Sequence, residues 1–308
     1  MNGELAGYAE DSRLPSHFNV TKLLKKGSNK LAVKVFRYSD GSYLEGQDYW
    51  KYSGIERDVY LYARPQSRVR DFRMTAELVN DYKDGELNLD VLLHQPKVGE
   101  SVEVKVLDKG KEIYNRKKSI TSITDTLFSQ QEIFPNIRAW NAETPNTYTL
   151  VVSTFDAQGK PLESFTHLFG FRTVEMRNGM QMINGKAVLF KGVNRHEHDP
   201  HKGRTISVAS MIHDIQLMKQ FNLNGVRNCH YPNYSAWYEL CTEFGLYMVD
   251  EANIESHGMM DHKDGTLANY PDWELPFMQR MNRMIARDRN YSAIVTWSMG
   301  NESGSVSY

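Results

Sequence analysis

The sequence has few cysteines, almost no net charge and no long hydrophobic run. Its two cysteines, Cys229 and Cys241, are too few for a disulfide framework and too far apart for a CxxC metal or redox motif. With 37 basic and 38 acidic side chains the formal net charge is −1, and no basic block is present. Nucleic acid and anionic membrane surfaces are therefore not expected as partners. No apolar run approaches the roughly 18 residues of a membrane span. We expect a globular protein with reduced thiols, located in the cytoplasm.

Several common signatures are also missing. The sequence has no phosphate-binding glycine loop, no GxSxG and no Cys/His dyad spacing. Its first 20 residues carry charges and glycines where a secretory signal would have an apolar core. The chain begins like the middle of a folded domain and ends just after a strand-like run. We therefore expect a fragment that is truncated at both ends, with the true N-terminus and any signal upstream.

Two β-rich stretches come first. Residues 1–67 contain strand-like runs at 31–36 and 58–63 around a turn-rich aromatic loop, which predicts an incomplete β-sandwich. Pro65 marks a natural boundary, because proline cannot donate to a central ladder. Residues 68–172 form a second β-rich stretch with six further runs of strand length, the last of them at 167–176, separated by turn sequences such as DGE, DKG and AQGK. This spacing is typical of an immunoglobulin-like sandwich.

In residues 173–308 strands alternate with helices. Strands are expected at 187–194, 224–230, 246–253 and 293–301, and helices at 207–222, 234–245 and 274–290. The first helix should have Ser207 as its N-cap and bury Met211, Ile215, Met218 and Phe221 on one face. Successive strand–helix units imply parallel strands, and four such units are the first half of a (β/α)₈ TIM barrel. Functional residues should then gather where the strands end.

Three residues at those ends could perform acid–base or metal chemistry. Glu302 follows the fourth strand next to an aromatic residue and backbone amides, a setting in which a carboxyl group can act as a general acid. Glu255 and His257 lie two residues apart after the third strand and could join Glu302 in holding a divalent cation. Two oxygens and one nitrogen suit Mg²⁺, or Mn²⁺, better than structural zinc. Ordinary solvated loops would show the same spacing, so this alternative remains open.

The loop RHEHDPH after the first strand is rich in histidine. A zinc site on it is conceivable, but the HExxH helical spacing is missing and Pro200 argues against a helix. Neutral imidazoles of His196 and of His230 after the next strand would instead suit a polyhydroxylated ligand, because imidazole can both donate and accept a hydrogen bond. Three tryptophans could stack on a sugar: Trp237, Trp273 and Trp297. Most tryptophans in such segments belong to the hydrophobic core.

Five motifs in order carry a resemblance to a known family. SDGSYLEGQDYWKYSGIERDV, GVNRHEHDP, RNCHYPN, LYMVDEANIESHGM and VTWSMGNESG resemble the large bacterial β-galactosidases of glycoside hydrolase family 2, from about Asn2 to the last residue. The resemblance implies a jelly-roll sugar-binding domain, an immunoglobulin-like domain and a catalytic barrel. It also implies retaining hydrolysis of terminal β-D-galactosides such as lactose, and a homo-oligomeric full-length enzyme.

The resemblance also implies roles for individual residues. Glu302 would be the acid/base, Asn301 would contact the sugar 2-hydroxyl, and Glu255, His257 and Glu302 would ligate Mg²⁺. His196 and His230 would hold galactosyl hydroxyls. Asp40 would reach the barrel mouth to contact galactose and help hold Na⁺, whose other ligands would be missing.

The carboxylate nucleophile of a retaining enzyme is not expected within this chain. Half a barrel would also have unpaired edge strands, so the chain alone should be poorly soluble or partly molten and have negligible turnover. Alternatives are a family 2 β-glucuronidase or β-mannosidase, a non-catalytic carbohydrate-binding or degenerate module, and a zinc hydrolase built on the histidine-rich loop.

Overall fold

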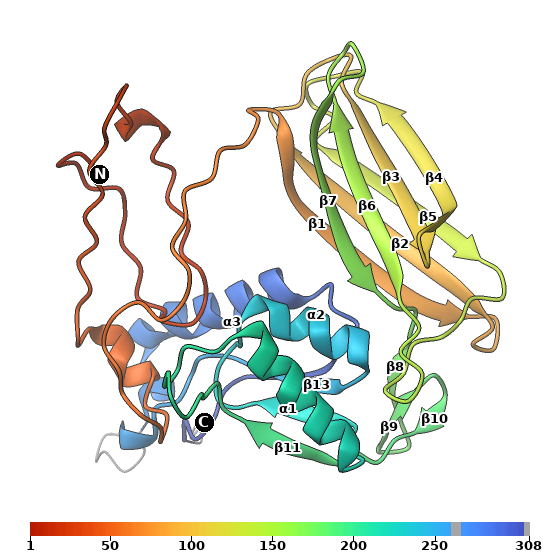
Figure 1. Ribbon diagram of the computed structural model, residues 1–308. Helices are drawn as coiled ribbons and strands as arrows, with labels where there is room; N and C mark the ends of the chain where they lie inside the picture. The colour runs from red at the N-terminus through yellow and green to blue at the C-terminus, as the bar shows by residue number, and fades with distance from the viewer. Residues whose placement is uncertain (260–265, 305–308) are drawn as a thin grey trace.

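The computed structural model describes residues 1–259 and 266–304. Figure 1 shows three successive parts: long N-terminal loops, a β-sandwich, and a parallel sheet with helices packed against it. This is the multidomain β plus α/β class that the sequence predicts. Within the described residues no helix is both long and apolar enough to cross a membrane.

The N-terminal part differs from the expectation of an incomplete sandwich. Residues 1–67, all of which the structure describes, contain two short 3₁₀ helices, η1 (Thr21–Leu23) and η2 (Asp40–Leu44), and no β-strand. The runs at 31–36 and 58–63 are present as extended loops (Figure 1), and Val33 and Leu61 are 59% and 71% exposed. The physical reason is that strand-forming residues need hydrogen-bonded neighbours, and a pair of isolated strands is at best marginally stable.

The sandwich consists of two antiparallel sheets. Its strands are β1 (Arg68–Val79), β2 (Asp84–His94), β3 (Ser101–Asp108), β4 (Lys111–Ser119), β5 (Leu127–Phe134), β6 (Tyr148–Phe155) and β7 (Pro161–Phe169). One sheet has the order β1-β2-β5 and the other β4-β3-β6-β7. Burial alternates along β2 and β6, so every second side chain enters the core between the sheets.

Two details of the sandwich were not predicted. Strand β5 was missed, because its centre is polar and only Phe128 and Phe134 are buried. The run 167–176 was expected as one strand, but it divides between β7 and β8 (Val174–Arg177). Strand β8 pairs with β9 (Met180–Ile183), which pairs with β10 (Lys186–Ala187), in a small antiparallel sheet that leads to the third part.

The third part has the parallel order β11-β12-β13-β14. Its elements are β11 (Gly192–Arg195), α1 (Val208–Gln220), β12 (Gly225–Asn228), α2 (Ser235–Phe244), β13 (Tyr247–Glu251), the 3₁₀ helices η3 (His257–Met259), η4 (Leu267–Asn269) and η5 (Pro271–Trp273), α3 (Glu274–Asp288) and β14 (Ile294–Ser298). This confirms the predicted half barrel. Strands β11 and β14 form the edges of this sheet within the described residues.

Local sequence determines the ends of the first helix. The Ser207 side chain accepts a hydrogen bond from Ser210 N, as an N-cap should. Met211, Ile215 and Met218 are buried against the sheet, but Phe221 is 74% exposed. The prediction for Phe221 was wrong because the helix ends at Gln220, and Phe221 occupies the C-cap, where the chain leaves the helical path.

The first strand is shorter than predicted and begins at a glycine. A Cβ atom on Gly192 would lie 2.6 Å from the carbonyl oxygen of Gly225 on the neighbouring strand. Only glycine permits this approach without a shift of the backbone. Gly192 therefore fixes how closely β11 and β12 pair.

Candidate active site

The predicted site residues other than Asp40 lie within a few residues of the ends of the four parallel strands. His196 follows β11, His230 follows β12 by two residues, Glu255 and His257 follow β13, and Asn301 follows β14. Carboxyl ends of parallel strands meet at one edge of the sheet. The structure consequently gathers these side chains in two groups at that edge.

The first group consists of Glu255, His257 and Glu302. One nitrogen or oxygen atom from each side chain lies within 4.8 Å of the others. His257 Nδ1 is 2.5 Å from Glu302 Oε2, and both side chains are about half exposed. Glu255 is fully buried, and its Oε2 accepts a hydrogen bond from Asn301 Nδ2 at 3.0 Å.

Backbone contacts fix the buried member of this group. Glu255 N donates to Leu44 O at 2.7 Å, and Gly46 N donates to Glu255 O at 2.8 Å. On the other side Asn301 N donates to Ile254 O at 2.9 Å. The loop after β13 is thus held between the N-terminal segment and the loop after β14.

The backbone around Glu302 is conformationally restricted. Glu302 has a φ of 35°, in the left-handed region that non-glycine residues seldom occupy. Gly300 has a φ of 139°, and a Cβ atom there would lie 2.6 Å from Ile254 O. Residues held in such conformations cluster at functional sites. The turn directs the Glu302 side chain toward His257.

The donors of this group fit a hard divalent cation. Glu255 Oε1 is buried and has no hydrogen-bond partner among the residues that the structure describes, which is costly unless another group compensates it. Two carboxylate oxygens and one imidazole, with two of the three side chains exposed to solvent, suit a partly hydrated Mg²⁺ or Mn²⁺. The residues present therefore fit the ion that the sequence predicts.

The second group contains the two predicted imidazoles. The rings of His196 and His230 have centroids 5.4 Å apart. Tyr49 from the N-terminal segment stacks on His196 with a centroid distance of 4.2 Å. Burial, followed by the nearby His230 and Arg13, lowers the pKa of His196 to about 4. His196 is therefore neutral at neutral pH and can both donate and accept.

A buried carboxylate orients His230. Glu251, at the end of β13, accepts hydrogen bonds from His230 Nδ1 at 2.8 Å, from Arg227 Nε at 2.7 Å and from Ser298 Oγ at 2.7 Å. Burial acts to raise the pKa of Glu251, but the hydrogen bonds from His230, Arg227 and Ser298 outweigh it and hold that pKa below its ordinary value. Arg227 also donates to Asn301 Oδ1 at 3.0 Å.

Sequence reasoning missed this arrangement. Neither Glu251 nor Arg227 was assigned a role from the sequence. The available signal in the sequence was an arginine inside a predicted strand. In the structure Arg227 of β12 pairs with Val249 of β13, and Val249 lies two residues before Glu251. Only 29% of the Arg227 side chain is exposed, and a largely covered arginine needs a carboxylate nearby.

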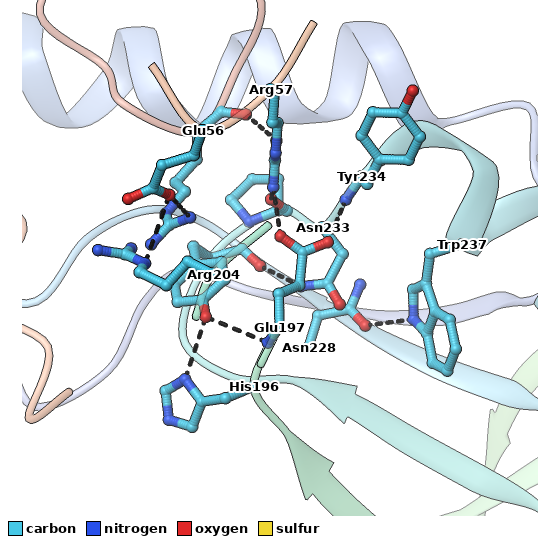
Figure 2. A network of polar contacts seen from close by, with 12 residues as sticks. Glu56, Arg57, His196, Glu197, Arg204, Asn228, Asn233, Tyr234 and Trp237 are labelled. Carbon is cyan, nitrogen blue, oxygen red and sulfur yellow. Dashed lines mark hydrogen bonds and ion pairs between the residues drawn. The ribbon is translucent and has the colours of Figure 1, made fainter. Parts of the chain in front are cut away.

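Glu197 joins the histidine-rich loop to the N-terminal segment (Figure 2). The Glu197 side chain is 1% exposed and pairs with Arg57 Nη2 at 2.6 Å, while Tyr234 N donates to its other oxygen at 2.6 Å. The Tyr231 hydroxyl contacts both His196 and Glu197, since it is 3.2 Å from His196 Nδ1 and accepts a hydrogen bond from Glu197 N at 3.3 Å. Glu197 thus helps position His196.

This geometry does not support a zinc site whose ligands all come from RHEHDPH. Glu197 is bound to Arg57, and the ring of His198 packs against Trp50 with a centroid distance of 4.4 Å. Among the residues that the structure describes, neither His198 nor His201 belongs to a group of three potential metal ligands.

Replacing Glu197 by glutamine should destabilise the chain at pH 7 by about 2 kcal/mol, because charge-assisted hydrogen bonds are lost. Burial opposes ionisation of Glu197, but Arg57 and Tyr234 N more than offset it, so its pKa lies below the ordinary value of 4.5. A lowered folded-state pKa means that the stabilisation is present above pH 4.5 and is lost as the pH falls through the lower folded value. Thermal unfolding of both proteins from pH 7 to 3 should show the difference shrinking only below pH 4.5. A pH-independent difference would contradict this.

Several predicted residues lie outside the two groups. Asp40 is exposed and lines a hollow of about 840 Å³ together with Asp272, Trp273 and Arg280, and neither His196 nor His230 lines it. Trp237 is fully buried and donates to Asn228 Oδ1 at 2.9 Å, so it is core. Trp297 is 37% exposed.

Matches to one family extend along nearly the whole chain. "Glycosyl hydrolases family 2, sugar binding domain" matches residues 1–65. "Glycosyl hydrolases family 2" matches residues 67–172, and "Glycosyl hydrolases family 2, TIM barrel domain" matches residues 174–308. The three matches agree with the predicted fold class. They include the sugar-binding part, residues 1–65, although the structure contains no paired strands there.

Curated relatives are similar over the same length. The β-galactosidase of Pseudoalteromonas haloplanktis is 46% identical over 98% of this chain, and that of Priestia megaterium is 43% identical over 98%. The chain spans only 30% and 31% of those two proteins.

Solved structures share the fold. A β-glucuronidase from Ruminococcus gnavus in complex with D-glucaro-d-lactam has a TM-score of 0.72 at 26% identity, covering 85% of this chain and 41% of that one. The apo structure of Bacteroides uniformis β-glucuronidase 3 has a TM-score of 0.71 at 24% identity, covering 83% and 31%.

Proposed function

Because the chain belongs to glycosyl hydrolase family 2, we propose that it carries the acid/base and sugar-binding residues of a retaining β-galactosidase. The observation that carries the proposal is the convergence of Glu302 with His257 and the buried Glu255 after β13 and β14. The names of the curated relatives supply the substrate class, terminal β-D-galactosides.

Glu302 would act twice on the glycosidic bond. As a carboxylic acid it would protonate the leaving oxygen, and as a carboxylate it would then take a proton from the water that releases the sugar. Its half-exposed side chain leaves it open to a substrate.

A retaining mechanism needs a second carboxylate roughly 5 to 5.5 Å from the first. Glu251 is held by Arg227 and His230, and Glu255 is fully buried. We assign the nucleophile to neither. We propose that it belongs to the part of the relatives that this chain does not span.

The sugar would lie against neutral imidazoles. His196 and His230 each use Nδ1 within the protein, so Nε2 is the nitrogen that could meet a hydroxyl. Asn301 accepts from Arg227 and donates to Glu255, and it retains one N–H and one lone pair for the 2-hydroxyl. Such fixed partners can favour the transition state over the ground state.

Mg²⁺, or Mn²⁺, would be held by Glu255, His257 and Glu302. When bound, the cation would supply positive charge that stabilises the ionised form of neighbouring carboxylates. Asp40 would help to hold Na⁺, and its exposed carboxylate is open to such an ion.

Two further proposals concern the whole protein. Both thiols, Cys229 and Cys241, are free and buried, which favours a reducing compartment such as the cytoplasm. By analogy with family relatives the full-length enzyme would be a homo-oligomer. Size-exclusion chromatography with light scattering on a full-length protein tests the second proposal.

The function can be tested in a chimera. Residues 1–308 would replace the matching segment of the P. haloplanktis β-galactosidase, with which they share 46% identity. The chimera should hydrolyse lactose and nitrophenyl β-galactoside with at least tenfold higher kcat/KM than the matching β-glucuronide or β-mannoside. A folded chimera that prefers a glucuronide or mannoside would assign this chain to that activity, and one with no hydrolysis would contradict the catalytic proposal.

The metal site can be tested on the 308-residue chain itself. Isothermal titration should give one Mg²⁺ per chain, and saturation at a hundredfold excess over Kd should stabilise the fold by about 2.7 kcal/mol. The variants Glu255→Gln and His257→Gln should lose both effects. His213→Gln, at an exposed position on α1, is the matched control and should keep them. Unchanged Mg²⁺ binding by Glu255→Gln would contradict the assignment.

A further inference from the structure

A second group of metal-ligand side chains lies in the proposed sugar pocket. His196, Cys229 and His230 each offer one donor atom, and the three atoms lie within 4.8 Å of one another. We propose that they form a binding site for a soft transition ion such as Zn²⁺, separate from the Glu255 group. We further propose that an ion there excludes the sugar. Only this second statement rests on the proposed function.

The two imidazoles are prepared as ligands. Nδ1 of His230 bonds to Glu251 Oε1 at 2.8 Å, and Nδ1 of His196 lies 3.2 Å from the Tyr231 hydroxyl. A carboxylate on one ring nitrogen fixes the tautomer and directs the lone pair of the other nitrogen toward a metal. Within the described residues Nε2 of neither ring has a hydrogen-bond partner in the protein, so both are available to an ion.

The third ligand is a thiol rather than an oxygen. Cys229 is 2% exposed and adjoins His230 in the chain. Burial raises the pKa of this thiol to about 11, so Sγ carries its proton when no ion is bound. On binding, a sulfur–metal bond would replace the S–H bond and the proton would pass to the buffer.

The spacing of the donors suits a tetrahedral ion after a small adjustment. Zn–S and Zn–N bonds of about 2.3 and 2.0–2.1 Å place tetrahedral ligands roughly 3.3–3.7 Å apart. Donors within 4.8 Å would therefore move together by about 1 Å. Both rings are only partly buried, which leaves the fourth position to water.

The chemistry of the donors separates the two sites. A thiolate with two imidazoles prefers Zn²⁺, Co²⁺ or Cu⁺, whereas two carboxylates with one imidazole accept Mg²⁺. The second site should therefore stay empty in millimolar Mg²⁺ and fill at much lower concentrations of Zn²⁺.

Cobalt titration of the reduced 308-residue chain tests the site. Co²⁺ should bind with one equivalent giving a near-ultraviolet sulfur-to-cobalt charge-transfer band, and excess Zn²⁺ should abolish that band. Cys229→Ser should lose the band and raise the Zn²⁺ Kd at least tenfold. The matched control is Cys241→Ser, which removes the other buried thiol and should keep the band.

Further variants locate the other ligands. His196→Gln, which leaves both thiols in place, should raise the Zn²⁺ Kd at least tenfold, while His257→Gln in the Mg²⁺ group should not change it. Circular dichroism would verify that each variant is folded. A band that survives in folded Cys229→Ser, or one that is lost in folded Cys241→Ser, would overturn the site.

Competition with the sugar is measured separately in the chimera. Zn²⁺ should raise KM for nitrophenyl β-galactoside without lowering kcat, and a chelator selective for Zn²⁺, added in excess Mg²⁺, should reverse this. Binding of Zn²⁺ through Cys229 without any change in KM would overturn the competition and leave the metal site standing. The metal site and the sugar site can thus fail independently.

Discussion

Replacing Glu302 by glutamine in the chimera is expected to lower kcat for lactose by about 10²–10⁴-fold. The amide keeps the size of the side chain but can neither give a proton to the leaving oxygen nor take one from water. The loss should be smaller for a nitrophenyl galactoside, whose leaving group needs little protonation. Steady-state kinetics on the two substrates would measure the difference.

A small anion provides the control for this prediction. Azide needs no general base, so it should restore turnover of the nitrophenyl substrate by the Glu302→Gln variant and leave the unmodified chimera almost unaffected. His257→Gln, which removes the contact to Glu302 Oε2, should reduce kcat less than Glu302→Gln. If both substrates lost activity equally and azide had no effect, Glu302 would not be the acid/base.

Removing Glu251 is expected to have the largest effect on stability. Glu251→Ala leaves the Arg227 guanidinium, the His230 Nδ1 and the Ser298 hydroxyl without their shared acceptor inside the sheet. Removing one partner of a buried charge pair costs about 3–5 kcal/mol, and because the Arg227 side chain is 29% exposed we expect a cost at the lower end, about 3 kcal/mol. Hydrogen exchange measured on peptides from β12 to β14 should show this loss of stability, because it reports on the parallel sheet separately from the sandwich.

Two variants support the interpretation of that result. Glu239→Ala, at an exposed position on α2, should change stability by less than about 0.5 kcal/mol. Glu251→Gln keeps two polar atoms and should cost less than Glu251→Ala. If β12 to β14 were equally protected from hydrogen exchange in Glu251→Ala and in the unmodified chain, the contacts of Glu251 would contribute nothing to the stability of the sheet.

Local sequence determined the order and type of most elements. The helix that begins after Ser207 and the helix that ends at Gly245 follow from a cap and a left-handed glycine, which are properties of a few adjacent residues. The parallel sheet follows from strand–helix alternation. The site residues could be chosen in advance because each follows one of those strands.

Other features depended on residues that are far apart in the chain. Glu251 acquires its role from Arg227 on the preceding strand, and Glu255 is held by Leu44 about two hundred residues earlier. Cys229 joins His196 only because β11 and β12 pair in register.

The sequence by itself determined the fold class, the family and the side chains at the strand ends, because periodicity, caps and motifs depend only on residues that are close together in the chain. Only the tertiary structure decided that the runs at 31–36 and 58–63 lack ladder partners, that Asp40 lies on a separate hollow and that Glu251 organises the site. Pairing, burial and ligand geometry are sums over non-local contacts, and no local pattern contains them.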